Sequence, residues 1–216
     1  IDGHIDISKA IWISTVVGFA AWPSMLILSV ALKWIVIGRH KAGRYPVWSF
    51  YYFRWWLVTR FQALTWSEMF VGTPLMSVYF RAMGARVGRH VTINTSLCST
   101  FDTVAIDDNT SIGSETQLLG YRVDDGMLVI GNLSIGKDCF VGQHCCLGLN
   151  TRLGDGARLD DMSLLADGTV MAPGEGRRGA PTMRARVAVP SLDNGHPKRR
   201  HPCLFGAIHI GLIYVM

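Results

Sequence analysis

Residues 129–171 read VIGNLSIGKDCFVGQHCCLGLNTRLGDGARLDDMSLLADGTVM, and an aliphatic residue recurs in this stretch at every sixth position. The series consists of Val129, Ile135, Val141, Leu147, Leu153, Leu159, Leu165 and Met171. This period fits neither the period of about 3.6 residues of an α-helix nor the two-residue alternation of a strand. It is typical of a hexapeptide solenoid, so we predict a mainly β chain folded as a left-handed parallel β-helix with three short strands per coil.

Two further positions of the repeat support this prediction. Small residues that suit a crowded inner corner follow the aliphatic ones four positions later: Cys139, Cys145, Thr151, Ala157, Ser163 and Thr169. Residues that tolerate a positive φ at a turn follow them three positions later: Asp138, His144, Asn150, Gly156 and Gly168. Met162 is the exception in this second set, and we expect a different geometry there.

The repeat begins earlier in the chain, with two irregularities. Its earlier inward positions are Val87, Val91, Ile93, Ile106, Thr110, Ile112, Thr116 and Leu118. The spacing from Ile93 to Ile106 is one residue longer than two repeats of six, which predicts a bulge within residues 99–105. The spacing from Leu118 to Val129 is five residues longer than one repeat of six, which predicts that residues 120–127 (GYRVDDGM) are extruded as a loop. Loops on a rigid scaffold are where binding and catalytic sites usually form.

The N-terminal part is strongly apolar. The chain is 49% hydrophobic with seven Trp, and residues 11–32 carry no charge. After an upstream tail (residues 1–10), residues 11–38 are long enough to span a bilayer, and the kink expected at Pro23 is tolerated in membrane helices. The segment is too long for a signal peptide and lacks a basic leader and a cleavage site. We predict a transmembrane helix; a buried core helix is the alternative.

Residues 39–84 form a basic and aromatic region. Basic residues follow the predicted span at once, which places this flank on the cytoplasmic side by the positive-inside rule. Residues 47–66 are rich in Trp, Phe and Tyr and are interrupted by Arg54 and Arg60, a composition that suits a helix lying in the headgroup layer. A helix that packs over the open end of the solenoid is the alternative, and the two interpretations are compatible.

The remaining segments complete the predicted organisation: the β-helix over residues 85–181, a basic linker over 182–203, and the start of a truncated transmembrane helix over 204–216. Both ends look cut, so we expect a fragment of a longer polytopic membrane protein. The net charge of +5 fits anionic membrane lipid better than nucleic acid, because no nucleic-acid motif is present. We therefore expect a membrane protein with its β-helix on the cytoplasmic side.

The cysteines and histidines do not indicate a metal site. The five Cys show no CxxC spacing, and Cys139 and Cys145 fall on inward positions where a packing role is expected. A cytoplasmic solenoid would keep them reduced. A zinc site between solenoid faces needs three convergent His, and only His90 and His144 lie within the predicted β-helix.

Four runs of the sequence carry a resemblance to a known family: ALKWIVIGRHKAGRYPVWSFYYFRWWLV, GTPLMSVYFRAMGARVGRHVTINT, FDTVAIDDNTSIGSETQLLGYRVDDG and ARLDDMSLLADGTVMAPGEGRRGAP. Over residues 31–181 the chain resembles the C-terminal tandem domains of epsilon-poly-lysine synthetase and related nonribosomal-peptide-synthetase-like enzymes. In that family an adenylation domain activates an amino acid and a carrier domain holds it as a phosphopantetheine thioester. Three tandem domains flanked by membrane helices then join the units. Gly179-Ala180-Pro181 also resembles the Gly-x-Pro closure common to hexapeptide acyltransferases.

The resemblance implies a transferase that forms amide bonds from an aminoacyl thioester. It implies no cofactor bound directly, and carrier and adenylation domains of the parent chain as partners. Ordinary hexapeptide enzymes are trimers, so the tandem copies could form a pseudo-trimer within one chain. Two alternatives remain: a hexapeptide acyltransferase that uses acyl-CoA, and a non-catalytic scaffold that docks the carrier and adenylation domains.

Three residues are candidates for catalysis, because amide formation needs a base to take the proton of the amine. His144 lies at a corner and faces away from the interior, and histidine is the side chain most often used as a general base near neutral pH. Asp102 lies at the predicted bulge, in a Phe-Asp pair that the family shares, and Glu115 lies shortly before the extruded loop. Roles in turns would explain all three residues equally well.

The candidates for substrate binding are Gln117, Tyr121, Arg122 and Asp124. Gln117 could donate to a carbonyl, and a loop that carries both charge signs could hold an aminoacyl group or a carrier arm. A solvated hairpin is the alternative for the loop. Related domains carry a His where this chain reads GSETQLLGYR (residues 113–122), and this departure leaves open whether this copy is catalytic.

Overall fold

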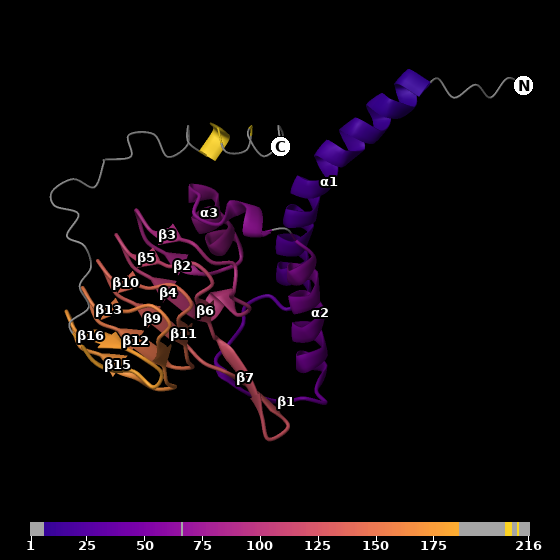
Figure 1. The fold of residues 1–216 in the computed structure, drawn as a ribbon. Helices are drawn as coiled ribbons and strands as arrows, with labels where there is room; N and C mark the ends of the chain where they lie inside the picture. The colour runs from indigo at the N-terminus through magenta and orange to yellow at the C-terminus, as the bar shows by residue number, and fades with distance from the viewer. Residues whose placement is uncertain (1–6, 66, 186–205, 209–210, 212–216) are drawn as a thin grey trace, which may run out of the picture.

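The computed structural model describes residues 7–65, 67–185, 206–208 and 211. Its elements are four helical segments that precede a solenoid, a hairpin that leaves the solenoid, and the coils themselves (Figure 1). Three predicted segments extend outside the described residues. The tail (residues 1–10) does so in part, and the basic linker and the second membrane segment (204–216) do so for most of their length.

The solenoid has three faces of short parallel strands. The first face stacks β2 (Arg86–Val87), β4 (Val104–Ile106), β9 (Leu133–Ile135), β12 (Thr151–Leu153) and β15 (Val170–Met171). The second stacks β3 (Thr92–Ile93), β5 (Ser111–Ile112), β10 (Phe140–Val141), β13 (Arg158–Leu159) and β16 (Gly176–Arg178), with β17 (Met183–Arg184) antiparallel at its edge. The third stacks β6 (Gln117–Leu118), β11 (Cys146–Leu147) and β14 (Leu164–Leu165).

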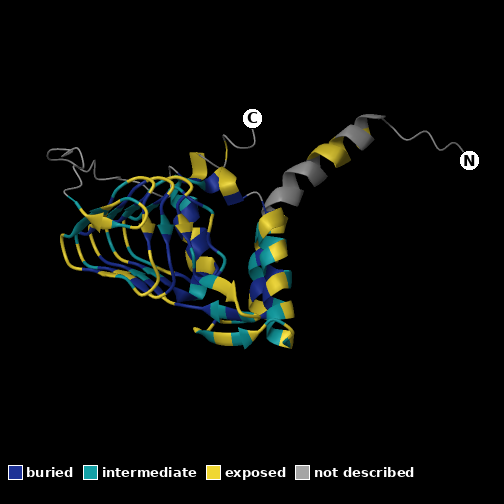
Figure 2. Ribbon diagram, turned by 60° about the horizontal axis from the view of Figure 1, so that its bottom comes forward, coloured by how far each residue is buried: buried dark blue, intermediate teal, exposed yellow. Residues whose placement is uncertain are grey.

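The strand register confirms the hexapeptide repeat. Val141 pairs in parallel with Leu159, three hexads later, and Leu147 pairs with Leu165 in the same way. The residues of the six-residue series from Ile135 to Met171 are all at most 1% exposed and belong to one core, which runs through the coils (Figure 2). The chain is therefore a parallel β-helix, and its six-residue period is that of the left-handed class.

Two details of the repeat differ from the prediction. Val129 is not a solenoid position, because it lies in β8 (Met127–Ile130), where its neighbours Leu128 and Ile130 are the buried residues. The regular series therefore begins at Ile135. Met162 does not depart from the common corner geometry: its φ of 52° matches the 51° of His144 at the equivalent corner one coil earlier.

Both predicted irregularities are confirmed. The extra residue before β4 is accommodated by a short 3-10 helix, η2 (Phe101–Thr103). The excess after Leu118 forms a hairpin of β7 (Tyr121–Asp124) and β8, which leaves the solenoid. An N-terminal strand, β1 (Gly43–Pro46), pairs with β8 and makes the hairpin a three-stranded antiparallel sheet.

The helices cover the start of the solenoid and this hairpin. The segment α1 (Ile7–Val36) lies beside α2 (Phe50–Leu64), and η1 (Ser67–Phe70) and α3 (Pro74–Ala82) follow (Figure 1). Met76, Phe80 and Met83 join the solenoid core, so α3 closes its open end. That position was the alternative for residues 47–66, but Trp55 and Val58 of α2 pack on Leu128 and Ile130 of the hairpin instead.

The predicted membrane segment coincides with α1. Among the described residues, no helix combines the length and the hydropathy needed to cross a bilayer. Near its C-terminal end α1 packs against the protein, where Leu26 and Val30 contact the solenoid core and Lys33 is fully buried.

Candidate functional site

The first part of the candidate site is a pair of side chains on one solenoid corner. Glu115 and His144 occupy equivalent corner positions in successive coils, with φ of 53° and 51°. The corners stack because the amide of His144 donates to the carbonyl of Ser114 at 2.8 Å. His144 Nδ1 lies 3.3 Å from Glu115 Oε2, and both side chains are exposed. A carboxylate on Nδ1 orients the imidazole and leaves Nε2 to accept a proton from a substrate.

The second part is a cavity of about 390 Å³ that begins on the same coil. It lies between the end of α2, η1, α3 and the first two coils of the solenoid. Gln117, two residues after Glu115, and Tyr121 of the hairpin line it, so two predicted substrate-binding residues meet here. Leu97, Leu118 and Phe101 contribute apolar wall.

Polar groups lie at the helical side of this cavity. Glu68 of η1 lines it, and among the described residues Glu68 makes no salt bridge. Gln62 Nε2 is buried at the wall without a hydrogen-bond partner, an arrangement that costs about 1–3 kcal/mol. Thr65 Oγ1 donates to the carbonyl of Gln62 at 2.7 Å and fixes the end of α2. Burial raises the pKa of the Cys98 thiol in this wall to about 12, so the thiol is not a nucleophile at neutral pH.

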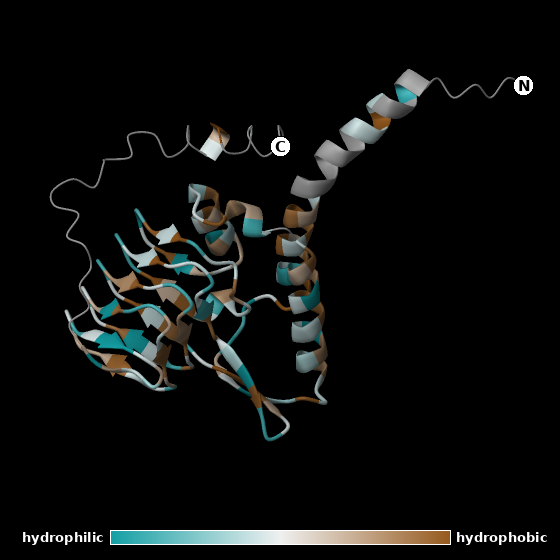
Figure 3. Ribbon diagram, in the orientation of Figure 1, coloured by the Kyte–Doolittle hydropathy of each residue, from teal (hydrophilic) through white to brown (hydrophobic). Residues whose placement is uncertain are grey.

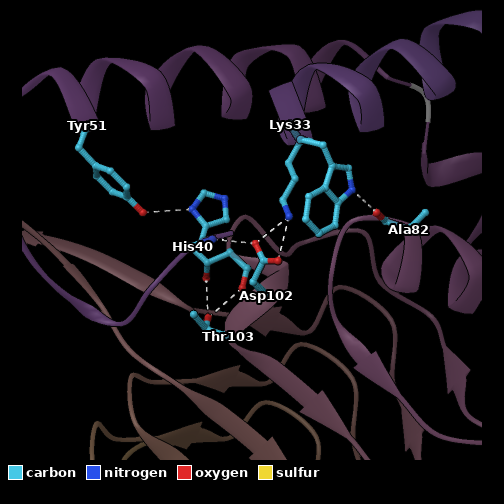
Figure 4. Close-up of polar contacts among 8 residues, drawn as sticks. Lys33, His40, Tyr51, Ala82, Asp102 and Thr103 are labelled. Carbon is cyan, nitrogen blue, oxygen red and sulfur yellow. Dashed lines mark hydrogen bonds and ion pairs between the residues drawn. The ribbon is translucent and has the colours of Figure 1, made fainter. Parts of the chain in front are cut away.

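Asp102 lies behind the cavity wall. It is the residue after Phe101, and its carboxylate accepts from Lys33 Nζ at 2.9 Å and 2.8 Å and from the amide of His40 at 2.9 Å (Figure 4). The Lys33 side chain is fully buried and that of Asp102 is 6% exposed. Gly84 is required beside this pair, because a Cβ there would lie 2.1 Å from Asp102 Oδ1. Asp102 therefore holds the wall residue Phe101 in place and does not itself line the cavity.

His40 and Tyr51 extend this buried cluster. Burial lowers the pKa of His40 to about 4, so its ring is neutral at physiological pH. Its Nδ1 lies 3.5 Å from Tyr51 Oη, and its Nε2 is buried without a partner. Burial, with a smaller effect of Tyr45, raises the pKa of Tyr51 to about 12. The cluster joins α1, the segment after it, α2 and the solenoid.

The structure thus separates the seven predicted site residues into three groups. Glu115, His144, Gln117 and Tyr121 lie along one strip from the corner into the cavity. Asp102 lies behind the wall of that cavity. Arg122 turns away to pair with Asp167 at 2.7 Å, and Asp124 is exposed near the tip of the hairpin.

Four residues of the site were not predicted: Lys33, His40, Gln62 and Glu68. Lys33 had a usable signal, because it is the single charge within the apolar residues 11–38 and such a charge needs a partner. No pattern marks Gln62 or Glu68, because only the packing of the helices on the coils brings them to the cavity.

The cysteines of the coils behave as predicted. Cys139 and Cys145 are buried on the inward small-residue position, and Cys139 Sγ donates to the carbonyl of Gly154 at 3.1 Å. Burial raises the pKa of Cys145 to about 11. Both are therefore packing residues outside the candidate site.

Comparison with known proteins gives a relative in sequence. No model of a protein family matches the chain. A delta-poly-L-ornithine synthetase of Acinetobacter baumannii (strain AB307-0294) is 34% identical over 136 residues, which are 63% of this chain and 10% of that protein. The chain thus spans about a tenth of the length of this relative. The sequence similarity is to a poly-amino-acid synthetase, as expected, but one named for ornithine.

Solved structures with a similar shape are hexapeptide-repeat acetyltransferases. A maltose O-acetyltransferase from Clostridium difficile 630 is 14% identical, with a TM-score of 0.49 over 71% of this chain and 95% of that one. A hexapeptide-repeat acetyltransferase from Vibrio cholerae, complexed with acetyl coenzyme A, is 14% identical, with a TM-score of 0.46 over 77% of this chain and 88% of that one. The fold assignment rests on the strand pairing of the chain itself.

Proposed function

We propose that this chain is a transferase domain that forms amide bonds within a larger poly-amino-acid synthetase. The observation that carries the proposal is the Glu115–His144 pair, which lies on an exposed corner of the same coil as the cavity residue Gln117. A base, a possible oxyanion donor and a cavity are the parts that acyl transfer to an amine requires. The similarity to a delta-poly-L-ornithine synthetase points the same way, as does the resemblance to the poly-lysine enzymes.

In the proposed reaction, His144 Nε2 takes a proton from the acceptor amine while the amine nitrogen attacks the carbonyl carbon of an aminoacyl thioester. Glu115 stabilises the imidazolium that results. The side-chain amide of Gln117 donates to the developing oxyanion. When the tetrahedral intermediate collapses, the C–S bond breaks, the C–N bond remains, and the imidazolium returns its proton to the leaving thiolate. The thioester is a substrate, carried by the phosphopantetheine arm of a carrier domain.

We further propose that the domain lies on a membrane, with the β-helix on the cytoplasmic side. The supporting feature is α2, where Phe50, Phe53 and Trp56 are exposed next to a fully exposed Trp48. Figure 3 colours the ribbon of this helix, which lies beside α1, by hydropathy. The guanidinium groups of Arg54 and Arg60 lie over the rings of Phe50 and Trp56, at 5.8 Å and 5.7 Å. Aromatic rings with adjoining cations suit the headgroup layer of anionic lipid. The carrier domain, the adenylation domain and a pseudo-trimer of tandem copies complete the proposed assembly.

The test uses the parent synthetase with His144→Asn, because Asn tolerates the positive φ of the corner. We expect the rate of polymer formation to fall by roughly 10²–10⁴-fold, as for loss of a general base. The matched control is His90→Asn, which alters another corner histidine with φ of 56° and should leave the rate unchanged. Glu115→Gln should lower the rate of polymer formation less than His144→Asn does, and it should shift the pH dependence of that rate.

The outcomes separate this proposal from its two rivals. Full activity of the His144→Asn synthetase would show that this domain is a scaffold or uses another base. Acyl transfer by the isolated chain from acetyl-CoA to an amine, at rates comparable with the synthetase, would favour a plain acyltransferase.

A further inference from the structure

The cavity beside η1 has an unusual charge for this protein. The chain carries a net charge of +5, yet no lysine, arginine or histidine is among the residues that line the cavity. Glu68 is the one carboxylate among these lining residues. Such a cavity disfavours a phosphate or a free carboxylate and favours a cation or a neutral group.

The cavity wall also combines apolar and polar surface in a way that suits an elongated ligand. Leu97, Leu118 and Phe101 supply contact for methylene groups. Gln62 Nε2 is buried at the wall without a partner, so no hydrogen bond through this nitrogen fixes the terminal amide, and its carbonyl oxygen can turn to accept from an ammonium group. Glu68 also lacks an ion-pair partner among the described residues, so both polar groups are available to a ligand.

We infer that this cavity is a specificity site that binds an alkylammonium group, with Glu68 as the counter-charge and the apolar wall against the alkyl chain. This inference rests on the proposed function for its place in the reaction. The cavity then holds the far end of the amine acceptor, and Gln117 at its border places the reacting amine near His144. Binding itself requires no catalysis, so it is tested separately.

The test measures binding of pentylamine and of pentanol, its neutral match, to the complete chain in detergent micelles by saturation-transfer NMR. We expect pentylamine to bind more tightly than pentanol. Glu68→Gln should weaken pentylamine binding about tenfold, as for loss of a hydrogen bond to a charged group, and leave pentanol binding unchanged. The control Asp107→Asn removes an exposed carboxylate of the solenoid and should change the affinity for neither pentylamine nor pentanol.

A second variant locates the binding. Ala63 of α2 lines the cavity, and Ala63→Trp should fill the space and abolish binding of both probes. Equal affinity of pentylamine for the original chain and for Glu68→Gln would overturn the inference, as would binding that survives Ala63→Trp. An inactive His144→Asn synthetase that still binds pentylamine supports this site. An unaltered synthetase that is active but does not bind pentylamine refutes the site without touching the proposed chemistry.

Discussion

The regular coils and the helical region at their start satisfy their polar groups in different ways. Within the coils from Ile135 to Met171, corner side chains bond the amides of the coil before: Asp155 accepts from Lys137 at 2.9 Å, and Asp161 accepts from Gln143 at 2.7 Å. In the described helical region, buried nitrogens of His40, Trp55 and Gln62 have no partner. The repeat therefore provides a rigid scaffold, and the unsatisfied nitrogens lie in the region that packs beside it, with that of Gln62 in the cavity wall.

The ion pair between Lys33 and Asp102 provides the strongest test of this contrast. Lys33→Met leaves the Asp102 carboxylate buried and unpaired, so we expect the free energy of unfolding to fall by about 3–5 kcal/mol. Guanidinium chloride unfolding of the chain in detergent micelles, followed by circular dichroism, measures the change. Because Asp102 holds Phe101 in the cavity wall, the variant should also weaken pentylamine binding.

Two further variants control this experiment. Lys137→Met alters an exposed lysine of the coils and should change stability by less than about 0.5 kcal/mol. Lys33→Met combined with Asp102→Asn removes both charges and should be more stable than Lys33→Met alone. A double variant no more stable than the single one would mean that burial of an unpaired charge is not the cause.

The same contrast explains how much of the fold the sequence predicts. A coil repeats its environment, so Leu147, Leu153 and Leu159 each report the same inward position, and their spacing alone predicts the register. The helical region has no repeat. Lys33 and Asp102 are 69 residues apart, and nothing local in either segment indicates that they meet. Single residues at the junction, such as Val129, were therefore misplaced even though the extruded hairpin around them was predicted.

His40 should make the helical region, and not the coils, sensitive to mild acid. Its folded-state pKa of about 4 lies below the ordinary value of 6.5, so the unfolded chain binds a proton that the folded chain does not. The contribution of neutral His40 to the free energy of unfolding is present above pH 6.5 and is lost as the pH falls toward 4. We expect a loss of about 2 kcal/mol between pH 6.5 and pH 5, measured by denaturant unfolding at each pH.

The groups that face His40 are Asp102, Lys33 and Tyr51, and burial raises the pKa of Tyr51 to about 12, far above this window. His40→Gln should therefore remove most of the change in the free energy of unfolding between pH 6.5 and pH 5. His90→Asn, which alters an exposed histidine of the coils, should keep the full slope. If both variants retain the slope, another group is responsible.

The candidate site was only partly predictable, for a related reason. His144, Glu115 and Gln117 belong to the repeat, so their corner and face followed from their positions. The structure brings His144 and Glu115 together and places Gln117 in the cavity wall. Glu68 and Gln62 belong to helices whose docking on the coils no periodic pattern encodes. The sequence therefore predicts the half of the site that the solenoid supplies and misses the half that the helices supply.

Substitution of Met162 has the smallest expected effect on the free energy of unfolding, and unlike the substitutions above it should raise that free energy. It occupies the corner above Glu115 and His144 with a φ of 52°, a conformation that is unfavourable for a long side chain, and the side chain is exposed. Met162→Gly should therefore raise the free energy of unfolding by about 1 kcal/mol. Met183→Gly, at an exposed position without positive φ, should lower it by roughly 0.5–1 kcal/mol.

The amide of Met162 donates to the carbonyl of Gln143 at 2.8 Å, so this corner is in register with the one that carries His144. If the stabilised Met162→Gly synthetase keeps its full rate, the strain at Met162 is a defect of the repeat without a role in the reaction. If the rate falls while the stability rises, the thioether side chain covers the Glu115–His144 pair, and the regular coils also carry strain where substrate binds. A loss of stability in Met162→Gly would show that side-chain contacts outweigh the backbone conformation at this corner.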